Sequence, residues 1–309
     1  MRLRVDGVVD MPANAWLGGK DSRHRRSGRY LSFMFSPVLS LRSLSVSVPA
    51  GRAVYFISDV HLGYGDPAVD RAREDLLLNV MHRLLVDVGH LFIVGDLFDV
   101  WFDYKKVIPR THLRTLHALQ TLRNADIPIT YLMGNHDFGH DSYFREELGI
   151  AIDGGDVVAS IGSKRFYISH GDGKAHNDTG YLILRSVLRN RAAQAVYRWL
   201  HPNLGITLAS RTSEGSRDYT SDKDYGSVDG LKDFGALKLH EGFDVVVMGH
   251  RHQPVFAPLK GGLYVNLGHW LGSEPTFGRY DPLRGEMGLF LARPFAESGA
   301  LIPYGSDRA

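Results

Sequence analysis

The chain has 309 residues, 44% of them hydrophobic, and a formal net charge of +2 at pH 7. This near balance argues against a protein that coats nucleic acid, because such proteins are usually strongly basic. The absence of cysteine excludes disulfides and thiolate metal sites and suits a reducing compartment. No run of 18 or more apolar residues occurs, so no membrane-spanning helix is predicted.

The first 50 residues differ from the rest of the chain. Residues 20–29 form a basic polar tract, and residues 30–50 are rich in serine and interrupted by Pro37. A secretory signal needs a cleaner apolar stretch. We therefore interpret residues 1–50 as a disordered extension or an early start assignment, with Met34 as another possible start; a targeting role is the alternative.

From residue 53 onward, short β-prone runs alternate with segments of helical periodicity. This alternation predicts an α/β fold with a largely parallel sheet. The predicted strands are 53–57, 90–94, 128–133, 157–161, 165–169 and 243–248. The predicted helices are 69–88 and 110–124. We place the main domain at residues 51–295 and a C-terminal tail at 296–309.

The alternation of strands and helices is interrupted at about residues 178–240. An amphipathic helix is predicted over about 179–201, and Pro202 and a polar stretch follow it. Because this segment lies between two of the polar motifs described next, the chain has to leave the site and return to it. We interpret the segment as an inserted helical lid.

Five polar motifs each follow a predicted strand. Ligands of open α/β sheets bind beyond the carboxyl ends of the strands, so these distant motifs are expected to meet in space. The motifs are Asp59-Val60-His61, Gly95-Asp96-Leu97-Phe98-Asp99, Gly134-Asn135-His136-Asp137, His170-Gly171-Asp172 and Gly249-His250-Arg251-His252.

The motifs contain enough ligands for two adjacent divalent cations. The candidate ligands are Asp59, His61, Asp96, Asn135, His170, His250 and His252. Asp96 could bridge both cations because a carboxylate has two oxygens. A mixed Asp, Asn and His set suits manganese, iron or zinc better than calcium, and we expect Mn²⁺. Paired cations are a common device for attacking phosphate esters.

Three further motif residues are candidates for supporting or catalytic roles. His136 is adjacent to a ligand and is the best candidate for contacting the scissile phosphate or protonating the leaving group. Asp99 and Asp137 could orient neighbouring histidines or could stabilise their loops. Asp96 is counted with His136 as catalytic because turnover is expected to depend on it.

In this order, the motifs resemble those of the calcineurin-like metallophosphoesterase superfamily, over roughly residues 53–275. The resemblance implies a four-layer α/β-β/α sandwich with two metals between the sheets. It implies that the first metal binds Asp59, His61, Asp96 and His252. It implies that the second metal binds Asp96, Asn135, His170 and His250.

A narrower resemblance is to the UDP-2,3-diacylglucosamine hydrolases of lipid A synthesis, most closely the Bacteroidetes/Chlorobi type. It rests on the segments Gly95–Phe102, Leu148–Ile150, His170–Gly173, Leu200–Asn203 and Asn266–Trp270. The proteobacterial enzymes carry Arg where this chain has His136, so the motif here has the general superfamily form. The resemblance implies release of UMP and 2,3-diacylglucosamine 1-phosphate by a cytoplasmic enzyme at the inner-membrane surface.

The lid helix fits a nucleotide-linked lipid substrate, because apolar positions at helical spacing are interleaved with basic residues. The candidate substrate-binding residues are His136, Arg185, Arg189 and Arg198. The alternative for the helix is ordinary packing on the body of the protein. The alternatives for the function are a phosphoesterase with another phosphomonoester, phosphodiester or nucleotide substrate, a DNA nuclease, and a non-catalytic scaffold.

Overall fold

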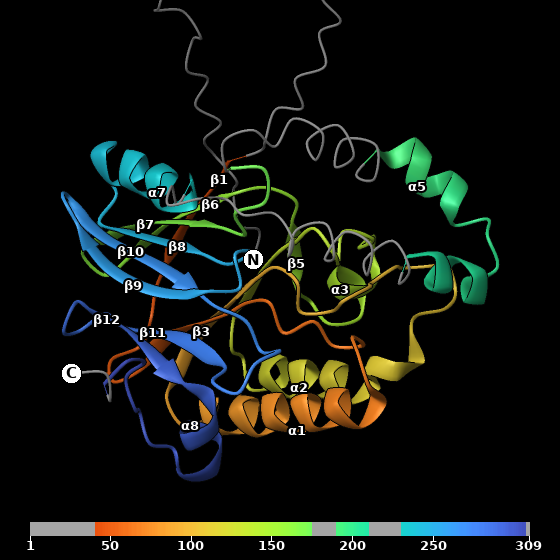
Figure 1. Ribbon diagram of the computed structural model, residues 1–309, viewed down its shortest axis with the longest axis horizontal. Helices are drawn as coiled ribbons and strands as arrows, with labels where there is room; N and C mark the ends of the chain where they lie inside the picture. Colours follow the sequence, from red (N-terminus) through yellow and green to blue (C-terminus); the bar gives the residue numbers. More distant parts are fainter. Residues whose placement is uncertain (1–40, 175–189, 210–229, 307–309) are drawn as a thin grey trace, which may run out of the picture. The chain divides into compact units, whose positions relative to one another are not determined.

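The computed structural model describes residues 41–174, 190–209 and 230–306. The chain divides into two units, Met1–Pro37 and Val38–Ala309, and every element described below belongs to the second. Its core consists of two six-stranded mixed sheets (Figure 1).

The first sheet holds the strands that lead into three of the motifs. Its order is β12-β11-β2-β3-β4-β5, with β2 to β5 mutually parallel and β11 and β12 antiparallel at one edge. The strands are β2 (Ala53–Ile57), β3 (Val88–Val94), β4 (Ile129–Leu132), β5 (Ala151–Asp153), β11 (Thr276–Asp281) and β12 (Glu286–Leu291).

The second sheet holds the strands that lead into the other two motifs. Its order is β1-β6-β7-β8-β10-β9, and β7, β8 and β10 are parallel neighbours. The strands are β1 (Arg42–Val46), β6 (Val157–Ile161), β7 (Lys164–Ser169), β8 (Val245–Met248), β9 (Pro254–Leu259) and β10 (Gly262–Leu267).

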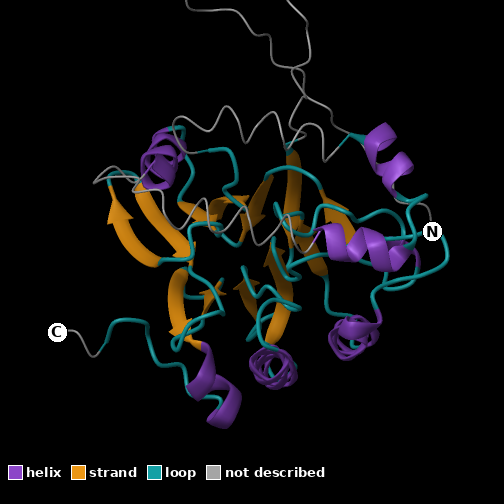
Figure 2. Ribbon diagram, turned by 45° about the vertical axis from the view of Figure 1, so that its right-hand side comes forward, coloured by secondary structure: helices purple, strands orange, loops and turns teal. Residues whose placement is uncertain are grey.

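Helices cover the outer faces of both sheets (Figure 2). The first sheet packs against α1 (Pro67–Leu84), α2 (Leu113–Asn124) and α8 (Ala292–Ser298). The second packs against α7 (Gly230–His240). The shorter helices are η1 (Arg110–His112), α3 (Tyr143–Glu146) and α5 (Arg191–Tyr197).

The alternation of side chains along β2 shows how the layers form. Successive strand residues point to opposite faces. Val54 and Phe56 therefore belong to the core between the sheets, whereas Tyr55 and Ile57 belong to the core under the helices. The Phe56 ring stacks 5.9 Å, centroid to centroid, from Phe166 of the opposite sheet. The predicted four-layer α/β-β/α sandwich is confirmed.

The predicted helix 69–88 is α1, Pro67–Leu84. Asp66 caps its N-terminus, because the Asp66 side chain accepts hydrogen bonds from Ala68 N and Val69 N, and proline occupies the first helical position. The helix ends earlier than predicted because Val88 already belongs to β3.

The structure corrects both predicted ends of the domain. Residues 42–46, assigned to the extension 1–50, form β1 and pair in parallel with β6. The segment was missed because Val46 is the one buried residue of this Ser-rich strand. At the other end, α8 crosses the predicted boundary at 295, and Tyr304 N donates a hydrogen bond to Leu289 O of β12.

The lid prediction is also corrected. Residues 230–240, assigned to the lid, form α7, and Leu231 and Leu239 are buried against the second sheet. The predicted helix 179–201 is not continuous, because Asn190 has an extended backbone and caps α5. A separate helical segment covers residues 202–209. Residues 175–189, which include Arg185 and Arg189, lie outside the described residues.

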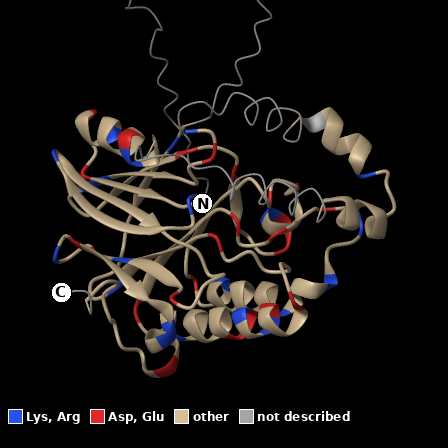
Figure 3. Cartoon of the chain, in the orientation of Figure 1, with Lys and Arg blue, Asp and Glu red and all other residues tan. Residues whose placement is uncertain are grey.

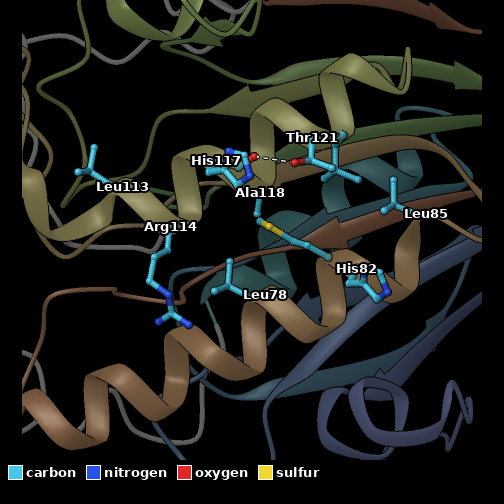
Figure 4. A pocket seen from close by; sticks show the side chains of 10 residues that line it. Leu78, His82, Leu85, Leu113, Arg114, His117, Ala118 and Thr121 are labelled. Atoms are coloured by element: carbon cyan, nitrogen blue, oxygen red, sulfur yellow. Dashed lines mark hydrogen bonds between the residues drawn. The ribbon is translucent and has the colours of Figure 1, made fainter.

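A groove between α1 and α2 opens on the outer helical layer (Figure 4). It is lined mainly by aliphatic side chains, together with His82, His117 and Arg114. The two helices that form it cover the first sheet, whereas the motifs follow the ends of the strands. This groove is therefore separate from the candidate metal centre.

Two buried histidines of this fold should make its stability depend on pH. Burial lowers the pKa of His90 and of His112 to about 4, from 6.5 in an unfolded chain. Because the folded-state pKa is depressed, stability is fully present above pH 6.5 and is lost as pH falls toward 4. We expect about 1–2 kcal/mol of lost unfolding free energy per histidine at pH 5.

Urea unfolding at pH 7.5 and pH 5.0 measures this loss. The variant His90→Phe removes the ionisable ring and leaves Thr130, the hydrogen-bond partner of His90, in place. It should show a smaller difference between the two pH values than the parent protein. An unchanged difference would exclude His90 as a source of the acid sensitivity.

Candidate metal centre

The seven predicted ligands form one connected cluster at the carboxyl ends of β2, β3, β4, β7 and β8. Each lies within 4 Å of at least one other member, measured between side-chain nitrogen or oxygen atoms. The structure therefore brings together residues that are up to 193 positions apart in the sequence, from Asp59 to His252.

Asp59, His61 and His252 form the first group of the cluster. His252 Nε2 lies 3.3 Å from Asp59 Oδ1, and His61 Nε2 lies 3.7 Å from the same oxygen. The two Nε2 atoms are 3.0 Å apart. Three ligand atoms thus face one point, as they would around a single cation.

Asn135, His170 and His250 form the second group. Asn135 Oδ1 lies 2.9 Å from His170 Nε2 and 2.9 Å from His250 Nδ1. His170 donates its Nδ1 hydrogen to Val94 O, because a carbonyl can only accept. That hydrogen bond fixes the orientation of the His170 ring with Nε2 directed at the cluster, where a bound cation would take the place of the Nε2 proton.

Asp96 joins the two groups through a single oxygen. Its Oδ2 lies 3.2 Å from His170 Nε2 and 3.8 Å from His61 Nε2. Its Oδ1 accepts a hydrogen bond from the backbone N of His136. We predicted a bridge that used both oxygens; in the structure Oδ2 faces both groups and Oδ1 anchors a loop.

Two buried carboxylate oxygens show that the cluster fits cations. Asp59 Oδ1 and Asp96 Oδ2 have no hydrogen-bond partner among the described residues. The other oxygen of each carboxylate is bonded, Asp59 Oδ2 to His250 N and Asp96 Oδ1 to His136 N. A buried anionic oxygen without a partner is costly, and a divalent cation between the groups would remove that cost.

The electrostatics of the site agree with this arrangement. Although burial opposes it, neighbouring histidines hold the pKa of both Asp59 and Asp96 well below the usual range. Burial lowers the pKa of His170, but the adjacent Asp96 carboxylate outweighs it and raises that pKa to about 10. The carboxylates therefore stay ionised and available as ligands at neutral pH.

The backbone of the candidate ligands is unusual. Asp59, His61, Asp96, His250 and His252 all have positive φ, between 53° and 70°. Residues other than glycine rarely adopt this left-handed region, and such conformations concentrate at functional sites. The strained turns therefore mark the same loops that the motifs identify.

Glycines let these loops approach one another closely. A Cβ atom on Gly134 would lie 2.0 Å from Asp96 Oδ1, and one on Gly249 would lie 2.3 Å from Asp59 Oδ2. Any side chain at these two positions would displace a candidate ligand.

Asp99 and Asp137 support the cluster in different ways. Asp99 Oδ1 lies 3.6 Å from Nδ1 of both His61 and His136, so it can orient either ring. The oxygens of Asp137 instead accept hydrogen bonds from Gly134 N, Leu97 N and the Tyr131 hydroxyl. Asp137 thereby ties two ligand loops together.

His136 lies at the edge of the cluster. Its ring meets the His61 ring edge-on, with centroids 4.9 Å apart. Burial lowers the pKa of His136 to about 4, so the ring is neutral at pH 7. A neutral ring can donate one hydrogen bond but is a poor general acid.

Ser58 was not among the predicted site residues. Its Oγ lies 2.5 Å from Asp59 Oδ2 and 2.7 Å from Val94 O, which fixes the carboxylate between two strand ends. A hydroxyl residue next to the first aspartate of a strand-end motif is the signal that could have identified it.

Arg198, predicted to bind substrate from the lid, contacts the loops beside the cluster. Its Nε donates to Asp103 O, and its guanidinium lies 5.5 Å from the centre of the Phe102 ring. Gln194 of α5 also donates to Phe138 O. The described part of the insertion is thus attached to the segments that follow the Asp96 and Asn135 motifs.

Known proteins resemble the chain over most of its length. The family model of the calcineurin-like phosphoesterases matches residues 53–254. A Porphyromonas gingivalis protein named UDP-2,3-diacylglucosamine hydrolase is 29% identical over 238 residues, which is 71% of this chain and 90% of that protein. A Yersinia pseudotuberculosis protein of the same name is 27% identical over 224 residues, 70% of this chain and 90% of that protein.

The family model covers all seven candidate ligands, which lie between residues 59 and 252. The family implies divalent metal ions, and the structure provides groups of His and Asp side chains able to hold them. The chain therefore belongs to the calcineurin-like phosphoesterase family and is a metal-dependent hydrolase.

Proposed function

We propose that the protein hydrolyses the diphosphate bond of UDP-2,3-diacylglucosamine and releases UMP and 2,3-diacylglucosamine 1-phosphate. The observation that carries this proposal is that two relatives named UDP-2,3-diacylglucosamine hydrolase align with this chain over 90% of their own length. The two-group cluster around Asp96 supports the hydrolytic chemistry.

Two bound divalent cations would polarise the phosphate oxygens and acidify a water molecule. We propose that Asp59, His61, Asp96 and His252 hold one cation. We propose that Asp96, Asn135, His170 and His250 hold the other. Mn²⁺ is the expected metal because the set mixes imidazole with carboxylate and amide oxygens, and iron or zinc suits the same ligands.

We propose that His136 acts as a hydrogen-bond donor to the phosphate. Its neutral ring, beside the cluster and next to Asp99, can donate to an oxygen that gains charge in the transition state. Either product of diphosphate cleavage leaves as a phosphate, which is a weak base. No general acid is therefore needed, and the low pKa of His136 is no obstacle.

We propose that the insertion presents the lipid part of the substrate and binds the inner-membrane surface from the cytoplasm. The described part of α5 has no charged residue from Ala192 to Tyr197 (Figure 3). Large apolar side chains are exposed on α5 and on the segment that follows it, at Val196, Trp199, Leu204 and Leu208. No described helix is long and apolar enough to span a bilayer. Arg198, with Arg185 and Arg189, would meet the anionic groups of the substrate.

A substrate panel tests the assignment. The purified protein with Mn²⁺ is incubated separately with UDP-2,3-diacylglucosamine in mixed micelles, UDP-N-acetylglucosamine, p-nitrophenyl phosphate and a DNA duplex. UMP release from the acylated nucleotide alone is the expected result. Preference for a soluble compound would assign another phosphoesterase activity, and cleavage of DNA would assign a nuclease.

Sedimentation with vesicles tests the membrane proposal separately. The protein should sediment with vesicles that contain phosphatidylglycerol, and Trp199→Ser should weaken this. Equal sedimentation of the parent and the variant would show that Trp199 does not contribute to membrane binding.

A further inference from the structure

His269 lies beside the candidate metal centre but belongs to none of the five motifs. It follows β10, the parallel neighbour of β8, and so reaches the same sheet edge as His250 and His252. The ring of His269 stacks on the ring of His252, with centroids 5.2 Å apart and planes inclined by 8°. A flat aromatic surface therefore covers one face of a candidate ligand.

The backbone on both sides of His269 is held firmly. Gly268 N donates to Asn266 Oδ1, and Asn266 Nδ2 donates to Gly249 O, directly before the His250 motif. Trp270 N donates to Asp59 O, and the Trp270 side chain is buried. His269 is thus presented from a segment bonded to both loops that supply the first group.

His252 has less support from its surroundings than two other histidine ligands, His61 and His170. His170 is oriented by its hydrogen bond to Val94 O, and His61 has Asp99 3.6 Å from its Nδ1. Among the described residues, His252 Nδ1 has no oxygen as a hydrogen-bond partner. Its side chain is also 30% exposed, against 0% for His61 and 1% for His170.

His269 interacts with His252 through the face of its ring and not through a hydrogen bond. His269 Nδ1 is buried and has no partner among the described residues. Stacked aromatic pairs contribute about 0.5–1.5 kcal/mol beyond their buried area. A contact of that size can favour one rotamer of a partly exposed imidazole.

We propose that His269 is a positioning residue that fixes the ring plane of His252 by stacking, so that His252 Nε2 faces the first cation site. The proposal rests on the metal centre of the proposed function but not on the identity of the substrate. It assigns a metal-affinity role to a residue outside the ligand set. Residues that orient metal ligands typically change affinity by about 10–100-fold when they are replaced.

The test measures Mn²⁺ binding to the metal-free full chain by isothermal titration calorimetry. His269→Phe retains a flat ring, whereas His269→Leu fills similar space without one. We expect His269→Leu to weaken one of the two sites about tenfold and His269→Phe to bind within about threefold of the parent. His82→Leu on α1, outside the centre, controls for loss of a histidine and should change neither site.

The outcomes separate this proposal from the metal centre itself. If the parent binds no Mn²⁺, the metal centre is wrong. If the parent binds two ions and His269→Leu binds them equally well, the stacking role is wrong. Equal losses in the Phe and Leu variants would show that a ring nitrogen matters, which would also overturn the proposal. Thermal melting of each metal-free variant confirms that it is folded.

Discussion

Replacing Asp96 with asparagine or alanine should lower kcat/KM by about 10³-fold or more. Asp96 Oδ2 lies near ligand atoms of both groups, 3.2 Å from His170 Nε2 and 3.8 Å from His61 Nε2, so its loss removes charge from both cation sites at once. Removal of a single electrostatic contact to a transition state already costs about 10²–10³-fold. Steady-state hydrolysis of the acylated nucleotide with saturating Mn²⁺ measures the effect.

The same substitutions should leave the metal-free fold intact. In the metal-free protein the buried Asp96 carboxylate is stabilised by neighbouring histidines, above all by His170, whose Nε2 lies 3.2 Å from Asp96 Oδ2. Asp96→Asn keeps the side-chain volume and an acceptor for His136 N but loses the attraction to the histidines, so the metal-free variant should still unfold cooperatively, at a lower temperature than the metal-free parent. Asp126→Asn is the matched control, since Asp126 also has a positive φ but lies in an exposed turn. Full turnover in Asp96→Asn would contradict the bridging role.

Replacing Asp137 with alanine should destabilise the protein by about 3–5 kcal/mol. Its two oxygens accept hydrogen bonds from Leu97 N at 3.0 Å, Gly134 N at 2.8 Å and the Tyr131 hydroxyl at 2.5 Å. All of these groups lie in the interior, so alanine would leave three buried donors without an acceptor. Urea denaturation at pH 7.5 measures the loss.

Asp137→Asn provides the graded comparison. An amide has one acceptor oxygen instead of two, so it should recover part of the loss but not all of it. Asp126→Ala, in its exposed turn, should cost about 1 kcal/mol or less. A loss below about 1 kcal/mol in Asp137→Ala would show that the two ligand loops do not depend on this carboxylate.

Much of the site could be predicted from the sequence because it depends on local signals. Asp59, Asp96 and His170 each follow a short apolar strand, and parallel strands place such ends together whatever their order in the sheet. The alternation along β2 is also a local signal. The layers of the fold and the positions of the ligand loops can therefore be predicted from sequence patterns of fewer than ten residues each.

Other features depend on contacts that no local pattern contains. Asp137 connects two loops because it accepts hydrogen bonds from Leu97 N, 40 positions away in the sequence, and from Gly134 N, three positions away. β1 is a strand because β6 offers it an edge, although its own residues are mostly polar. The stack of His269 on His252 likewise arises from the pairing of β10 with β8.

The central claim is that one aspartate oxygen is shared by two cations. A crystal of the protein grown with Mn²⁺, with anomalous data collected at the manganese edge, tests it most directly. We predict two anomalous peaks, about 3.5–4 Å apart, on either side of Asp96 Oδ2. A single peak, or a pair that lies away from Asp96, would contradict the account.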